Sequence, residues 1–253
     1  MKIEEMINKI FLETSGNFEY LKQMPDNSID LIIIDPPYLT TKENWDKKEV
    51  VTEWLSKELF RIAKDSCSLY VWCGIGEKSQ SLIRWFPIFN KDWYFKDLIT
   101  WKKDRGIGMR KGWLYTREEI MWFVKDNKKF IWNKEEQYLV GKQRIRDKNG
   151  IKPNQQGQMP ISIYPRISNV WDDISESTFN LTDISSLHYT PKPIAAIERI
   201  IRVSTKENDI VLDCFIGSGS TALACKNLNR NFIGMEIYQE YIDITYKRLR
   251  GEL

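Results

Sequence analysis

The amino-acid sequence predicts an α/β fold built on a doubly wound, mostly parallel sheet. Three observations predict it. Short apolar runs alternate with segments of helical spacing along most of the chain, as in successive βα units. Two of these runs end on an aspartate, Asp35 and Asp213, and the second run leads through glycines into a helix. Because ligands bind outside the carboxyl ends of parallel strands, both aspartates are expected at one site.

The N-terminal part of the chain predicts strands and helices in alternation. Residues 30–34 (DLIII) and 67–73 (CSLYVWC) are short runs rich in β-branched and aromatic residues, which indicates buried strands. Between them, residues 46–65 carry apolar side chains at helical spacing. Further strands are expected at 94–101 and 118–125, where apolar and aromatic residues again gather.

The C-terminal third continues this alternation. It predicts a helix at 191–204, a strand at 209–215, a helix at 219–228, a strand at 231–237 and a helix at 239–250. The first of these helices has a proline near its start and isoleucines along one face, which is typical of a helix that packs on a sheet.

Composition excludes several classes of protein. The N-terminus lacks the apolar stretch of a secretory signal, and no segment reaches the roughly twenty apolar residues that span a bilayer, so a cytoplasmic protein is expected. The chain has four cysteines and one histidine, with no C-x-x-C pair. This pattern indicates buried thiols and no metal site or disulfide framework.

Positive charge is concentrated in one segment. The whole chain has a net charge of +3, but residues 102–166 contain sixteen Lys and Arg against seven Asp and Glu. The same segment interleaves tryptophans and tyrosines with these charges, a combination that suits phosphate contacts and base stacking. The segment is predicted to be a basic insert that binds nucleic acid, and the alternative is a solvated surface with a few core aromatics.

The segment DCFIGSGST, which begins at Asp213, predicts a cofactor site. A strand ends at Asp213, turns through Gly217 and Gly219 and enters a helix at Ser220. Glycines in such a turn let the backbone approach a nucleotide-like ligand closely. The next strand ends at Glu236, where an acidic side chain can accept hydrogen bonds from ribose hydroxyls. The turn lacks the third glycine of a dinucleotide fingerprint and the lysine of a phosphate loop, which favours an adenosine without phosphates over NAD or ATP.

Four blocks of the sequence resemble one family, the S-adenosylmethionine-dependent amino-methyltransferases of DNA. The blocks are MPDNSIDLIIIDPPY, HYTPKPIAAIERIIR, DIVLDCFIGSGSTALACKNLNRNFIGMEI and EYIDITYKRL. Their order is that of the permuted (beta) group, in which the catalytic motif precedes the cofactor motif. The resemblance implies a circularly permuted, Rossmann-like methyltransferase domain at 1–101 and 167–253, with an inserted target-recognition region at 102–166.

The resemblance also implies which residues hold the cofactor, S-adenosyl-L-methionine. Glu236 would bind its ribose, Asn17 would hydrogen-bond its adenine ring, and Thr190 and Lys192 would lie near its methionine carboxylate. The glycine-turn residues would hold the methionine and adenosine parts, namely Asp213, Phe215, Gly217, Ser218, Gly219, Ser220 and Thr221.

The segment Asp35-Pro36-Pro37-Tyr38 is the candidate catalytic motif. The exocyclic amine of a nucleobase is a poor nucleophile because its lone pair is delocalised into the ring. An Asp35 carboxylate and the Pro36 carbonyl could each accept one N–H bond and so localise that lone pair. Two successive prolines fix φ near −65° and hold the carbonyl rigidly, and Tyr38 would stack on the target base.

The predicted function is a site-specific DNA adenine-N6 methyltransferase. The choice of adenine follows from the resemblance, since relatives with Asp before Pro-Pro-Tyr are mostly adenine enzymes. An N4-cytosine or RNA amino-methyltransferase and a non-catalytic nucleic-acid-binding module are the alternatives. Double-stranded DNA is the expected partner, and the resemblance allows a homodimer and a cognate restriction endonuclease. The target base must leave the duplex to reach Asp35.

Overall fold

The computed structural model describes residues 1–13, 18–107, 111–138, 164–176 and 191–253. These residues form one eight-stranded sheet in the order β1-β8-β7-β2-β3-β5-β4-β6. Pairing is parallel from β1 to β3 and between β4 and β6, and antiparallel between β3 and β5 and between β5 and β4. The strands are β1 (Lys9–Leu12), β2 (Ile29–Ile34), β3 (Ala63–Cys73), β4 (Tyr94–Ile107), β5 (Tyr115–Val124), β6 (Val170–Trp171), β7 (Ile210–Asp213) and β8 (Asn231–Glu236).

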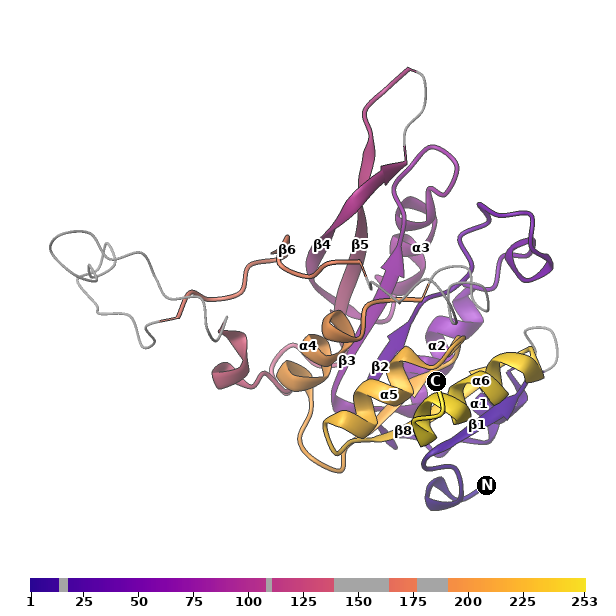
Figure 1. Cartoon of the computed structure of the whole chain (residues 1–253). Coiled ribbons are helices and arrows are strands. Elements are labelled where there is room, and N and C mark those ends of the chain that lie inside the picture. The colour runs from indigo at the N-terminus through magenta and orange to yellow at the C-terminus, as the bar shows by residue number, and fades with distance from the viewer. Residues whose placement is uncertain (14–17, 108–110, 139–163, 177–190) are drawn as a thin grey trace, which may run out of the picture.

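Helices cover both faces of the sheet (Figure 1). They are α1 (Glu19–Gln23), α2 (Glu53–Ile62), α3 (Ser81–Phe89), α4 (Ile194–Ser204), α5 (Ser220–Asn227) and α6 (Gln239–Arg250), with short 3-10 turns at Ile3–Glu5, Asn44–Asp46 and Lys134–Gln137. The alternation of side chains along β2 divides the core: Ile32 and Ile34 pack with α1, α2 and α3, whereas Leu31 and Ile33 pack with α4, α5 and α6. The predicted doubly wound, mostly parallel sheet is therefore confirmed.

Two boundaries differ from the prediction around α2. The helix begins at Glu53 and not at residue 46. Thr52 is its N-cap, because the Thr52 hydroxyl accepts a hydrogen bond of 3.2 Å from the backbone N–H of Leu55, and such a cap fixes the first helical turn. The following strand begins at Ala63, four residues before the predicted start.

The pairing of β4 with β5 continues past residue 102, which is the predicted start of the insert. β4 runs on to Ile107 and β5 begins at Tyr115, and together they form a long hairpin whose outer part projects beyond the helices (Figure 1). Residues 102–107 and 115–124 are thus part of the sheet, because β4 and β5 pair with each other along this hairpin. Residues 139–163, which hold much of the remaining insert, lie outside the described residues. The recognition role of the insert stays a prediction.

The aromatic residues of the insert segment divide between core and surface. Trp101, which precedes the segment, is buried, and Trp122 stacks between Tyr70 and Trp132 with ring centroids 5.7 and 5.1 Å away. Trp113, in contrast, is 94% exposed near the hairpin tip. Only the exposed aromatic rings of this segment are therefore available to stack on bases.

None of the helices in the described ranges is long and apolar enough to cross a bilayer. All four cysteines are buried with free thiols.

Candidate active site

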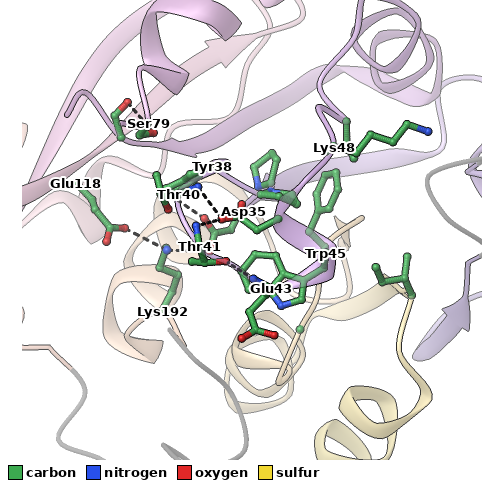
Figure 2. A pocket seen from close by; sticks show the side chains of 18 of the residues that line it. Asp35, Tyr38, Thr40, Thr41, Glu43, Trp45, Lys48, Ser79, Glu118 and Lys192 are labelled. Carbon is green, nitrogen blue, oxygen red and sulfur yellow. Dashed lines mark hydrogen bonds and ion pairs between the residues drawn. The ribbon is translucent and has the colours of Figure 1, made fainter. Parts of the chain in front are cut away.

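A cavity of about 1190 Å³ opens at the carboxyl ends of the central strands (Figure 2). β2 and β7 are neighbouring strands. From β2 the chain goes on to β3 on one side of this pair in the strand order, and from β7 it goes on to β8 on the other side. Ligands bind at such a switch point in open α/β sheets. The segment after β2 contributes Asp35, Pro36, Pro37 and Tyr38, and the ends of β7 and β8 contribute Phe215, Gly217 and Glu236.

Asp35 is held by one donor on each carboxylate oxygen. The Tyr38 hydroxyl donates to Oδ1 at 2.9 Å, and Lys192 Nζ lies 2.8 Å from Oδ2. Burial raises the pKa of Asp35, and the nearby Lys192 ammonium limits that rise. Burial and the Asp35 carboxylate raise the pKa of Tyr38, so its hydroxyl stays protonated. Each carboxylate oxygen has two lone pairs, so Asp35 can still accept a hydrogen bond from a substrate.

Lys192 connects Asp35 to a second carboxylate. Its Nζ lies 3.1 Å from Glu118 Oε2, and Glu118 Oε1 pairs with Lys103 Nζ at 2.7 Å. Burial disfavours the charged form of Lys192, but Asp35 and Glu118 together raise its pKa above the ordinary value. Burial likewise disfavours the Glu118 carboxylate, yet Lys192 and Lys103 lower its pKa. The four groups therefore form a row in which carboxylates and ammonium groups alternate.

A buried aspartate fixes the loop that follows Tyr38. The Asp46 carboxylate accepts hydrogen bonds from the backbone N–H groups of Leu39, Thr40 and Thr41 at 2.6, 2.7 and 2.5 Å. Leu39 has φ of 63°, a left-handed conformation that is uncommon for leucine. Asp46 is 2% exposed. Its carboxylate thus stabilises a strained turn directly beside the candidate catalytic motif.

The glycine turn after β7 is shaped by Asp213. Asp213 Oδ1 accepts a hydrogen bond of 2.9 Å from the Phe215 N–H, and Oδ2 accepts one of 2.6 Å from the Thr221 hydroxyl. Burial raises the pKa of Asp213 to about 7. Gly219 has φ of 82°, and a Cβ atom built on it would lie 2.2 Å from Thr245 Cγ2. Glycine is therefore required there both by conformation and by space.

Glu236 lies opposite this turn at the end of β8. Its Oε2 accepts a hydrogen bond of 3.0 Å from the Gly217 N–H, and its Oε1 accepts bonds of 2.8 and 3.1 Å from the N–H groups of Ile237 and Tyr238. Burial raises the pKa of Glu236. These bonds fix the carboxylate in the cavity wall with lone pairs left for a ligand.

A second cavity of about 40 Å³ lies between the glycine turn and Asp35. Among its lining residues, Trp72 Nε1 and Ser220 Oγ are buried and have no hydrogen-bond partner within the described part of the chain. An unsatisfied buried polar group costs about 1–3 kcal/mol, so both atoms are available to bind a polar group in this cavity.

The structure brings most of the predicted site residues together. Asp35, Lys192, Phe215 and Gly217 line both cavities. The small cavity adds Asp213, Ser218, Ser220 and Thr221. Gly219 caps the N-terminus of α5. Asn17 and Thr190 lie outside the described residues. Sequence reasoning missed Asp46, Glu118 and Lys103, because each is an ordinary charged residue outside any motif.

Comparison with known proteins finds relatives along nearly the whole chain. Residues 29–247 match the DNA methylase family. The chain is 36% identical over 249 residues to the type II methyltransferase M.HpaI of Haemophilus parainfluenzae, an alignment that covers 94% of this chain and 73% of that protein. It is 32% identical over 247 residues to the DNA adenine methyltransferase YhdJ of Escherichia coli strain K12, which covers 90% of this chain and 79% of that protein.

Solved structures share the same architecture. The M1.HpyAVI–SAM complex has a TM-score of 0.61 and 27% identity, and the match covers 95% of this chain and all 100% of that chain. The PvuII DNA methyltransferase, named as cytosine-N4-specific, has a TM-score of 0.71 at 19% identity, with 95% of this chain and 85% of that chain covered. The second likeness concerns the fold alone.

Proposed function

The chain belongs to the DNA methylase family of S-adenosylmethionine-dependent methyltransferases, and we propose that it methylates N6 of an adenine flipped out of duplex DNA. The observation that carries this proposal is the position of Asp35. Its carboxylate lines the same cavity as the glycine turn and Glu236. An acceptor for the target amine and a nucleoside-binding wall are thus side by side.

The lining of the two cavities fits S-adenosylmethionine. Glu236 would accept hydrogen bonds from the ribose hydroxyls, and Phe215 would contact the adenosine. The small cavity would receive the polar end of the methionine part, and the Ser220 hydroxyl and Trp72 N–H there have no partner among the described residues. Bound there, the cofactor supplies the methyl group. Asn17 and Thr190 are proposed as further contacts on the strength of the family resemblance.

Asp35 would act on the target amine as a hydrogen-bond acceptor. A charge-assisted bond to Asp35, with a second bond to the Pro36 carbonyl, localises the nitrogen lone pair and stabilises the positive charge that develops on nitrogen. Pro36 is buried and Pro37 follows it directly, so the two rings hold the carbonyl in a fixed direction. Tyr38 lines the cavity and would stack on the base that enters it.

The choice of adenine over cytosine rests on two supports of different kind. By family resemblance, relatives with Asp before Pro-Pro-Tyr, as in Asp35-Pro36-Pro37-Tyr38, are mostly adenine enzymes. In addition, the relative YhdJ is named as a DNA adenine methyltransferase. A carboxylate by itself can accept a hydrogen bond from the amine of either base, so N4-cytosine or RNA amino-methylation is the alternative within the same chemistry.

The decisive test is the identity of the methylated base. Purified protein is incubated with labelled S-adenosylmethionine and duplex DNA, single-stranded DNA or RNA, and the products are digested to nucleosides and identified by mass spectrometry. We expect 6-methyladenine from duplex DNA as the main product. Dominant 4-methylcytosine would overturn the choice of base, and DNA binding without any transfer would indicate a non-catalytic binding module.

Three further features are proposed from the family. A homodimer and a cognate restriction endonuclease are proposed from the family resemblance, and the relative M.HpaI is named as a type II methyltransferase. Action on chromosomal DNA would place the enzyme in the cytoplasm. Size-exclusion chromatography with light scattering measures the first of these directly.

A further inference from the structure

Four charged side chains form a largely buried row that ends on the candidate catalytic carboxylate. They come from four segments: Asp35 follows β2, Lys192 precedes α4, Glu118 lies in β5 and Lys103 lies in β4. Consecutive partners are 2.8, 3.1 and 2.7 Å apart. The side chain of Lys192 is only 9% exposed. Figure 2 shows the Lys192 ammonium facing Glu118 beside Asp35.

Within the described residues, four groups engage the Lys192 ammonium. Besides the two carboxylates, the rings of Tyr38 and Trp72 lie with their centroids 5.3 Å from Nζ, a distance at which the ring faces attract a cation. Without this ammonium, two carboxylates would face each other in a largely buried site, where like charges repel strongly and one of them takes up a proton.

We propose that Lys192 is a positioning residue for Asp35: it fixes Asp35 Oδ2 and cancels the repulsion between the Asp35 and Glu118 carboxylates, while Glu118 holds Lys192 in place. This inference rests on the proposed function, in which Asp35 accepts a hydrogen bond from the target amine. It departs from the role that family resemblance implies, in which Lys192 lies near the methionine carboxylate of the cofactor. The two roles separate experimentally.

The direction of each substitution follows from the groups that face Asp35. Lys192 lowers the pKa of Asp35, whereas Glu118 raises it. Lys192→Met therefore raises that pKa, and the acid limb of the rate profile moves to higher pH, because only the ionised carboxylate is a strong acceptor. Adding Glu118→Gln removes the like charge of Glu118 and reverses part of the shift. The titratable and charged groups around Asp35 are Tyr38, Lys192, Glu118, Lys103, Cys73 and Asp213.

The neighbouring Glu119 offers a matched control. It is buried and lies next to Glu118 in β5, but its carboxylate accepts a hydrogen bond of 2.6 Å from the Thr100 hydroxyl and pairs with Arg117 at 3.1 Å. Glu119→Gln removes a carboxylate from the same strand without removing a partner of Lys192. When Glu119→Gln is added to Lys192→Met, we therefore expect no recovery of the Asp35 pKa or of methyl transfer.

The experiment measures three quantities in wild type, Lys192→Met, Glu118→Gln/Lys192→Met and Glu119→Gln/Lys192→Met. The pKa of Asp35 is titrated by NMR in cofactor-free protein with ¹³C-labelled aspartate, cofactor affinity is measured by calorimetry, and methyl transfer to duplex DNA is measured against pH. We expect Lys192→Met to raise the pKa of Asp35 and to slow transfer at pH 7 on the order of 100-fold. Adding Glu118→Gln should raise the rate of transfer again by about tenfold, since a tenfold change corresponds to one pKa unit. Cofactor affinity should stay within a few fold of wild type in every variant.

Several results would overturn the proposal. An unchanged Asp35 pKa in Lys192→Met, together with a large loss of cofactor affinity, would make Lys192 a ligand of the cofactor. Equal recovery by Glu118→Gln and Glu119→Gln would remove the specific role of Glu118. If Lys192→Met does not fold, Lys192→Gln takes its place in all three variants that carry it. The Gln side chain keeps a hydrogen-bond donor to Asp35. A wild-type protein that transfers no methyl group would refute the proposed function, and the NMR titration would still decide the positioning role.

Discussion

Asp35 owes its environment to one neighbour and one residue that is distant in the sequence. Its carboxylate is held by Tyr38, three positions along the chain, and by Lys192, which precedes α4. Asp213 is instead held by a backbone N–H and a hydroxyl of the glycine turn, and Glu236 by backbone N–H groups of that turn and of the residues after β8. The surroundings of Asp35 therefore differ from those of the other two acids. Asp35 faces the Lys192 ammonium and the cavity, whereas Asp213 and Glu236 shape the wall that would hold the cofactor.

This difference predicts a division of labour between two single variants. Asp35→Ala should lower methyl transfer on the order of 1000-fold, because the preorganised acceptor for the amine is lost, and it should leave cofactor affinity within a few fold. Glu236→Gln should weaken cofactor binding about 10- to 100-fold, since a charged hydrogen-bond acceptor is lost. Calorimetry with the cofactor and a transfer assay at saturating cofactor separate the two effects.

Each variant serves as the control for the other. If Asp35→Ala retained substantial turnover, Asp35 would not be the acceptor of the target amine. If Glu236→Gln bound the cofactor as tightly as wild type, the ribose would have to lie elsewhere in the cavity.

The predicted residues that the structure places at the cavities are those whose type is unusual for their position. An aspartate followed by two prolines and a tyrosine cannot continue a helix or a central strand, and a glycine-rich turn needs left-handed backbone, so both segments stand out. Glu118 and Asp46 do not stand out, because an acid in a strand or a loop is common on any surface. Only the three-dimensional structure shows that Asp46 is buried and that Glu118 faces Lys192.

At the scale of elements, the loop between β2 and α2 is the segment that the sequence described least well. The helical spacing of residues 46–65 continues through Val50 and Val51, but the helix begins only at Glu53. Asp46 ends a 3-10 turn, and its carboxylate is turned back onto the backbone of the Leu39 segment. The helical spacing of apolar residues predicts which side chains are buried. It does not predict which backbone groups a buried carboxylate will bind.

The Asp46 contacts predict a positional effect on catalysis. Asp46→Asn places an amide N–H₂ group against backbone N–H donors, which costs about 1–3 kcal/mol of stability and releases the left-handed turn at Leu39. Because Tyr38 directly precedes Leu39, transfer should fall about tenfold or more through misplacement of the motif, while cofactor affinity changes little. Thermal melting, calorimetry and the transfer assay measure these quantities.

Asp126→Asn is the matched comparison for Asp46→Asn. Asp126 also accepts a hydrogen bond from a loop N–H, that of Lys128 at 2.8 Å, but its loop follows β5 and does not line the cavity. Equal losses of transfer in both variants would mean that the Asp46 effect is one of general stability.

At the scale of the whole molecule, sheet order explains how distant motifs meet. β2 pairs with β7, so Asp35, which follows β2, and Asp213, at the end of β7, reach the same edge of the sheet although 178 positions separate them. The sequence could predict this meeting because the carboxyl ends of parallel strands lie at the same end of the sheet. It could not predict that β5 would pair antiparallel between β3 and β4, since strand order across a hairpin depends on long-range packing.

The distribution of charge over the molecule leads to a prediction about DNA binding. The net charge of +3 conceals a basic segment at 102–166. The part of that segment in β4 and β5 forms the hairpin whose Lys103, Tyr115 and Arg117 line the cavity. DNA that presents a base to Asp35 is therefore expected to pass this hairpin. We expect affinity for duplex DNA to fall steeply as salt rises, because each neutralised phosphate releases counterions.

Two exposed lysines of the hairpin segment, Lys102 and Lys111, allow this to be measured. Replacing both by glutamine should flatten the plot of log affinity against log salt by about 0.9 for each lysine that contacts a phosphate. The control replaces two other exposed lysines, Lys2 and Lys9, of which Lys9 begins β1 at the opposite edge of the sheet, and it should leave the slope unchanged. Fluorescence anisotropy with a labelled duplex gives the slopes. A hairpin variant with the wild-type slope would show that the DNA backbone does not run along β4 and β5, whereas a changed slope in the control would place the duplex across the β1 edge, away from Asp35.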